Sequence, residues 1–85
     1  MRIFVANLPF NVDENALTQC FAQYGEVWNV RLMRDAMNQS RGFAFVDMRD
    51  RDGMLAVQEL NGQRWETRVL HVAEARPMVP KTQPA

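Results

Sequence analysis

Residues 41–48 read Arg-Gly-Phe-Ala-Phe-Val-Asp-Met, and this stretch decides the fold. Its aromatic and β-branched residues favour a β-strand, in which successive side chains point to opposite faces. One set is apolar throughout and suits a covered core: Ala44, Val46 and Met48. The other set is mixed: Arg41, Phe43, Phe45 and Asp47. A face that meets solvent should be polar, so the two phenyl rings of the mixed set predict that something covers them.

A second strand of the same kind is predicted over residues 2–7, Arg-Ile-Phe-Val-Ala-Asn, which the pair Leu8-Pro9 closes. Its core set is Ile3 and Val5. Its open set is Arg2, Phe4 and Ala6. If this strand lies beside residues 41–48, Phe4 joins Phe43 and Phe45 on one open surface.

The residues between these two strands predict a helix and a further strand. We expect Asp13 to cap the N-terminus of the helix and Gly25 to end it. One apolar stripe follows helical spacing: Leu17, Cys20, Phe21 and Tyr24. Residues 27–33 alternate as a strand, and the polar residues 34–40 form a loop before the next strand.

A second helix and a last strand are predicted after residue 48. The helix begins at Asp50 or Asp52 and ends at Asn61-Gly62. Its apolar stripe includes a glycine that weakens the helix by up to ~1 kcal/mol relative to Ala: Gly53, Ala56, Val57 and Leu60. The last strand covers residues 68–73, and the segment around Trp65 predicts a small extra hairpin before it.

The predicted order is β-α-β-β-α-β, the split arrangement of ferredoxin-like folds. The predicted fold class is therefore α+β, with a four-stranded antiparallel sheet packed on two helices in a two-layer sandwich. Both helices cover the same face of the sheet, so the other face stays open. The phenyl rings are predicted to lie on that open face.

Length and composition bound the function. The chain has 85 residues, enough for one small domain. Its apolar runs are too short to span a membrane and no signal peptide is visible, so we expect a cytoplasmic protein without membrane contact. The single cysteine, Cys20, excludes an internal disulfide. Ten basic residues balance ten acidic ones, with a pI of about 6.6, so any affinity for phosphate must come from local charge.

The two strands resemble the RNA-recognition-motif family. Residues 41–47 fit the octamer signature K/R-G-F/Y-G/A-F-V-x-F/Y, which is missed at Met48, a core position. The family's hexamer signature is met by Ile3-Phe4-Val5-Ala6-Asn7-Leu8. The chain looks most similar to short single-motif RNA-binding proteins of bacteria and to glycine-rich RNA-binding proteins. The resemblance covers residues 1–76, and residues 77–85 are expected to be a disordered tail.

The resemblance implies a role for each matched residue. Phe4 and Phe45 would each stack a base, and Phe43 would pack between sugars or against a base. Arg41 would pair with a phosphate. Arg76 would lie where the family's C-terminal segment touches RNA. Ala73 stands where close relatives often have Asn, so base preference does not follow from the resemblance.

Other residues reach the open face by alternation alone. Each of these is as well explained by solvation as by contact with RNA: Arg2, Asn29, Arg31, Met33 and His71. Asp47 also lies there, and it would either accept a hydrogen bond from a base or pair with a nearby Arg.

Three occupants of the phenyl rings stay open at this stage. Flanking Arg residues favour single-stranded RNA, because bases stack on aromatic rings while guanidinium groups pair with phosphates. Single-stranded DNA would use the same rings. A peptide or a second copy of the chain is the alternative, although we expect a monomer. The sequence has no arrangement of catalytic residues, and His71 has no partner at metal-ligand spacing, so we expect neither an enzyme nor a metal or other cofactor.

Overall fold

The computed structural model describes residues 1–75 of the chain. Arg76 and the predicted tail, residues 77–85, lie outside the described residues. The elements follow in order: β1 Arg2–Ala6, α1 Glu14–Ala22, β2 Val27–Arg34, β3 Ser40–Met48, α2 Asp50–Leu60, β4 Arg64–Trp65, β5 Arg68–Val69 and β6 His71–Glu74. This order confirms the predicted β-α-β-β-α-β arrangement, with the predicted hairpin inserted before the last strand.

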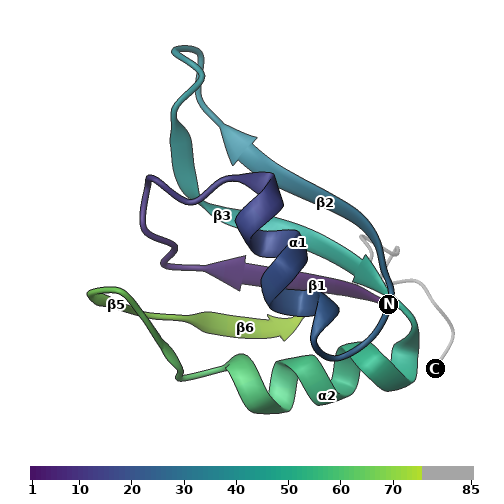
Figure 1. Ribbon diagram of the computed structural model, residues 1–85. Helices are drawn as coiled ribbons and strands as arrows, with labels where there is room; N and C mark the ends of the chain where they lie inside the picture. The colour runs from purple at the N-terminus through teal and green to yellow at the C-terminus, as the bar shows by residue number, and fades with distance from the viewer. Residues whose placement is uncertain (76–85) are drawn as a thin grey trace, which may run out of the picture.

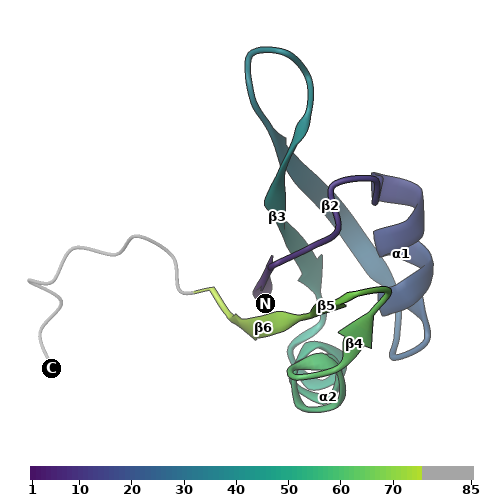
Figure 2. The ribbon, with the colours of Figure 1, turned by 90° about the vertical axis from the view of Figure 1, so that its left-hand side faces the viewer.

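The main sheet has four strands in the order β2-β3-β1-β6, and every neighbouring pair is antiparallel. Both helices pack on one face of it, α1 against β2 and α2 against β6 (Figures 1 and 2). Within residues 1–75, no element covers the opposite face. The ferredoxin-like α+β fold is therefore confirmed, and β1 and β3 lie side by side at the centre of the sheet.

The core forms between the sheet and the helices, from the residues that alternation assigned to it. The largest fully buried side chains come from both layers: Phe21, Ile3, Leu17, Met48, Val5 and Val46. Gly53 of α2 belongs to the same interface, because a Cβ at this position would overlap the side chain of Met1 and crowd Ile3. An alanine would favour the helix, but the Met1 side chain would have to move and the new Cβ would lie 3.3 Å from Ile3 Cδ1.

The first helix begins as predicted and ends earlier. The Asp13 carboxylate accepts a hydrogen bond of 2.9 Å from the Ala16 amide, which makes Asp13 the N-cap. The helix ends at Ala22, with Gln23 as its C-cap, so the predicted end at Gly25 is wrong. The Tyr24 amide donates to the Phe21 carbonyl, a bond over three residues that tightens the last turn before Gly25.

The last strand is divided, which the sequence did not predict. Residues 68–69 pair with β4 in the two-stranded hairpin, whereas β6 pairs with β1 in the main sheet. Leu70 lies between them, buried, and its amide donates to the Gln63 carbonyl at 2.8 Å. Trp65 is half-buried against the core, as predicted for hairpin packing. The segment predicted as one strand is therefore shared between two sheets, and Leu70 separates its two parts.

β2 departs from simple alternation at two places, between Val27 and Asn29 and between Leu32 and Arg34. Each irregularity shifts the register against β3, whereas residues 29–32 between the two keep the period of two. Arg34, the last residue of β2, pairs through both guanidinium nitrogens with Glu14 of α1. This ion pair ties the start of the helix layer to the edge of the sheet.

Candidate nucleic-acid interface

The pairing register arranges the side chains of the open face in rows. Residues directly opposite each other in an antiparallel pair present their side chains on the same face. The central row crosses all four strands: Arg31, Phe45, Phe4 and Ala73. The row on one side of it is Asn29, Asp47 and Arg2. The row on the other side is Phe43, Ala6 and His71. The rows bring together residues of four strands that lie far apart in the sequence.

Three phenyl rings form a continuous aromatic platform, defined here as Phe4, Phe43 and Phe45. The ring centroid of Phe4 lies 5.8 Å from that of Phe43 and 5.6 Å from that of Phe45. Phe43 and Phe45 lie edge to face, with centroids 6.3 Å apart. Each ring is half-buried rather than fully exposed, because the rings cover part of one another. The platform therefore leaves aromatic surface open on this face of the sheet.

Guanidinium groups flank the platform. The Arg41 guanidinium lies 5.4 Å from the centroid of Phe43, and that of Arg2 lies 5.9 Å from the centroid of Phe45. These are cation–π distances, so each cation is held beside a ring while remaining close to solvent. A cation beside an open aromatic surface can pair with the phosphate of a base that stacks there.

Asp47 forms an ion pair with Arg2 next to the platform. Its carboxylate accepts a hydrogen bond of 3.0 Å from Arg2 Nε in the neighbouring strand. This contact lowers the pKa of Asp47 from its ordinary value, with a smaller contribution from Asn29 in the same row. Of the two roles predicted for Asp47, the structure places it in an ion pair with Arg. Arg2 is thus partly neutralised where the platform ends.

Gly42 lies near the start of β3 and directly precedes Phe43 of the platform. Its φ of 86° is left-handed backbone that glycine adopts without strain. The Gly42 carbonyl accepts a hydrogen bond of 2.9 Å from the Leu8 amide, and the Gly42 amide donates to Ser40 Oγ at 3.0 Å. These bonds fasten the loop after β1 to the start of β3.

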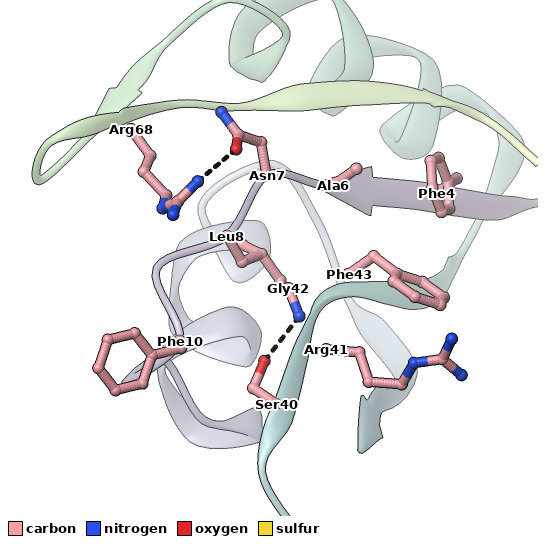
Figure 3. A pocket seen from close by; sticks show the side chains of 10 residues that line it. All are labelled: Phe4, Ala6, Asn7, Leu8, Phe10, Ser40, Arg41, Gly42, Phe43 and Arg68. Atoms are coloured by element: carbon pink, nitrogen blue, oxygen red, sulfur yellow. Dashed lines mark hydrogen bonds between the residues drawn. The ribbon is translucent and has the colours of Figure 1, made fainter. Parts of the chain in front are cut away.

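A pocket that the sequence did not reveal adjoins the platform. It has a volume of about 400 Å³, and Figure 3 shows its lining: Phe4, Ala6, Asn7, Leu8, Phe10, Ser40, Arg41, Gly42, Phe43 and Arg68. Phe10 is 80% exposed, the most exposed large apolar side chain within residues 1–75. The one sequence signal for it is an aromatic residue in a predicted loop, outside any periodic pattern.

The remaining predicted site residues divide into placed and unplaced ones. Arg31 lies opposite Phe45 and is exposed, and His71 lies opposite Ala6 and is exposed. Met33 lies at the second irregularity of β2 and has no partner in the register, so its place on the open face stays a prediction. Arg76 falls outside the described residues.

No helix within residues 1–75 is long and apolar enough to cross a membrane. No group of three or more His, Cys, Asp or Glu side chains in that range is placed to hold a metal ion. Cys20 is half-buried in α1, where burial raises the pKa of its thiol.

Comparisons with known proteins agree with the fold and with the motifs. The "Putative RNA-binding protein RbpE" of Nostoc sp. is 42% identical over 79 residues, which cover 91% of this chain and 80% of that protein. Among solved structures, the crystal structure of RNA Binding Protein PG1 matches with 42% identity and a TM-score of 0.86, covering 91% of this chain and 98% of that one. A Sex-lethal protein–RNA complex matches with 32% identity and a TM-score of 0.87, covering 93% of this chain and 48% of that one.

The family model for the RNA recognition motif matches residues 3–71, which span both signature strands and both helices. The high identity to a cyanobacterial protein of similar length agrees with the resemblance to bacterial single-motif proteins. The chain therefore belongs to the RNA recognition motif family.

Proposed function

We propose that the chain binds single-stranded RNA by stacking bases on the aromatic platform. One observation carries the proposal: three phenyl rings with centroids within 6.3 Å of one another lie on the sheet face opposite both helices. Exposure of apolar rings to water is unfavourable, so a ligand that covers them gains binding free energy. The names of the relatives, which include RNA-binding proteins and an RNA complex, support RNA as that ligand.

Each ring has a distinct part in the proposal. Phe4 and Phe45 each stack one base, and Phe43 packs against a sugar or a third base. Stacking contributes about 1–3 kcal/mol per base, and association costs several kcal/mol, so two or three stacked bases give modest affinity. The exchange of any one base for another alters stacking little, so base preference must come from polar groups at the platform's border.

Phosphate contacts are assigned to arginines near the rings. Arg41 lies beside Phe43, and Arg31 lies opposite Phe45, so both can reach the backbone of a strand on the platform. Arg76 is proposed as a further contact from its place in the sequence, directly after the described residues. With a balanced net charge, we expect a salt dependence that corresponds to only a few phosphate contacts.

A module that holds a single strand without acting on it chemically suits post-transcriptional regulation or RNA chaperoning. We therefore place the chain among proteins that bind transcripts.

Fluorescence anisotropy with a labelled pool of random-sequence RNA tests the proposal. The variant Phe43→Ala/Phe45→Ala should weaken binding by at least tenfold, because two rings of the platform are lost. The matched control is Met54→Ala/Leu55→Ala, which removes two apolar side chains, 64% and 45% exposed, from α2. This control should bind like the wild type. Equal binding by both double variants would refute stacking on the platform.

Two further readouts separate the alternatives. Unlabelled random-sequence DNA should compete less well than unlabelled random-sequence RNA of the same length, since the 2′-OH is the group that distinguishes them. Size-exclusion chromatography should give a monomer at low and high salt. A dimer that persists in high salt and dissociates in Phe43→Ala/Phe45→Ala would instead assign the platform to self-association.

A further inference from the structure

A tight turn presents Phe10 to solvent beside the platform. The Val12 amide donates to the Pro9 carbonyl at 3.1 Å, which closes a turn with Phe10 near its tip. Leu8 and Val12, on either side of this turn, are buried in the core. The phenyl ring is therefore held outward by an anchored loop, and it contributes little to the core. Single exposed apolar side chains are common on protein surfaces, but Phe10, at 80% exposed, also lines the pocket beside the aromatic platform.

Arg68 belongs to the β4–β5 hairpin and lines the pocket. Its Nη1 donates to Asn7 Oδ1 at 2.7 Å, and Asn7 Nδ2 in turn donates to the Val69 carbonyl at 2.8 Å. Asn7 can serve both partners because its backbone is left-handed, with φ of 63°, which turns the chain sharply after β1. Within residues 1–75, no carboxylate lies within ion-pair distance of Arg68, so its charge remains available.

The pocket joins these two side chains to the platform. Figure 3 shows Phe10 and Arg68 at one end of the pocket and Phe4 and Phe43 at the other. No acidic residue lines the pocket, whereas Arg41 and Arg68 both do. An aromatic ring, an unneutralised guanidinium and a shape continuous with the platform together fit one nucleotide, with its base against the ring and its phosphate on the cation.

We propose that this pocket is a subsite for one nucleotide beyond those on the platform, with Phe10 contacting the base and Arg68 the phosphate. The inference rests on the proposed function, because it extends the same strand of RNA past Phe4 and Phe43. Phe10 and Arg68 lie outside both sequence signatures. Asn7 lies within the hexamer signature, and the inference gives it a role that the resemblance did not imply. Asn7 is a positioning residue, because its Oδ1 accepts the hydrogen bond that orients Arg68.

A length series of RNA tests the subsite by NMR titration of the labelled, full-length protein. Random trinucleotides are compared with tetranucleotides extended at the 5′ or the 3′ end. For the wild type, extension at one of the two ends should tighten binding by about fivefold or more, as expected for one more stacked base. In Phe10→Ala this gain should disappear, while the trinucleotide Kd stays within about twofold of wild type.

Arg68→Gln and Met54→Ala complete the series. Arg68→Gln should reduce the gain from extension and leave trinucleotide binding unchanged. The Asn7 amide signal should shift with tetranucleotide in the wild type and in Met54→Ala, and less in Arg68→Gln. Met54→Ala, on α2, should keep the full gain. A gain that persists in Phe10→Ala, or no gain at either end for the wild type, would overturn the subsite and leave the platform intact. Failure of the wild type to bind either length would overturn the proposed function itself.

Discussion

Phe4 and Phe45 lie directly opposite each other across β1 and β3, with ring centroids 5.6 Å apart. Their side chains come from residues far apart in the sequence, and the central pairing of the sheet brings them into one surface. Because the rings contact each other, each supports the position of the other. The two residues are therefore expected to act as a unit in binding.

A double-mutant cycle measures this coupling. Phe4→Ala and Phe45→Ala should each raise the Kd for RNA by roughly 5- to 150-fold, equivalent to about 1–3 kcal/mol per stacked base. The double variant should lose less binding free energy than the two single losses together, since removal of one ring already disturbs the other. Isothermal titration calorimetry gives the four Kd values. Losses that add fully would show that the rings act independently.

Asp47 restrains Arg2, so its neutralisation should strengthen binding. In Asp47→Asn, the negative charge is removed and the Arg2 guanidinium is released toward the RNA backbone. We expect tighter binding at low salt and a salt slope steeper by about one ion. The matched control is Glu14→Gln, which removes the same charge from an ion pair on the helix layer. A slope unchanged in Asp47→Asn, or equally changed in the control, would contradict this role for Asp47.

Arg41 is expected to contribute a phosphate contact. Arg41→Gln should weaken binding across all RNA sequences alike and lower the salt slope by about one. Arg51→Gln supplies the control, because Arg51 is exposed on α2 and its loss changes the net charge equally. The slopes are obtained from binding curves at several salt concentrations. Loss of preference for particular bases in Arg41→Gln, with an unchanged slope, would assign Arg41 to base recognition instead.

The Glu14–Arg34 ion pair gives a pH dependence of stability. The hydrogen bond from Arg34 is the main cause that lowers the pKa of Glu14 from 4.5 to about 2. A carboxylate with a lowered folded-state pKa stabilises the protein above its unfolded-state pKa, and this stabilisation is lost as the pH falls. The window of loss is therefore pH 4.5 down to about 2.

The variant Glu14→Gln isolates that contribution. Both partners are partly exposed, so solvent screens the pair, and it should stabilise the fold only slightly above the unfolded-state pKa of Glu14. Urea unfolding of wild type and variant should show this difference at neutral pH and its decline toward pH 2. A difference that is constant over the whole range would show that the ion pair does not carry it.

The platform could be predicted because a strand has a period of two. In residues 41–48, the positions of Phe43 and Phe45 follow directly from Ala44 and Val46 being core residues, and Phe4 follows once β1 and β3 are adjacent. Alternation also brought Arg2, Asn29, Arg31 and His71 to the correct face in the register. These features depend on local pattern, which a single sequence contains.

Other features depend on tertiary contacts. The second irregularity of β2, which leaves Met33 without a register partner, lies directly before Arg34, the residue that pairs with Glu14 of α1. The pairing of Arg2 with Asp47 depends on register to a single residue. Phe10 lies in a loop whose turn is fixed by burial of its neighbours and by the bond from Leu8 to Gly42. No periodicity marks Phe10, so the sequence did not identify it as a candidate site residue.

The most direct test of the central claim is an NMR titration of labelled protein with short random RNA, which maps the binding face residue by residue. Base stacking on the platform predicts shifts concentrated in β1 and β3, with few in α1 and α2, and loss of these shifts in a folded Phe43→Ala/Phe45→Ala variant. Shifts centred on the helices, or the same β1 and β3 shifts in that variant, would contradict the claim that RNA binds on the aromatic platform.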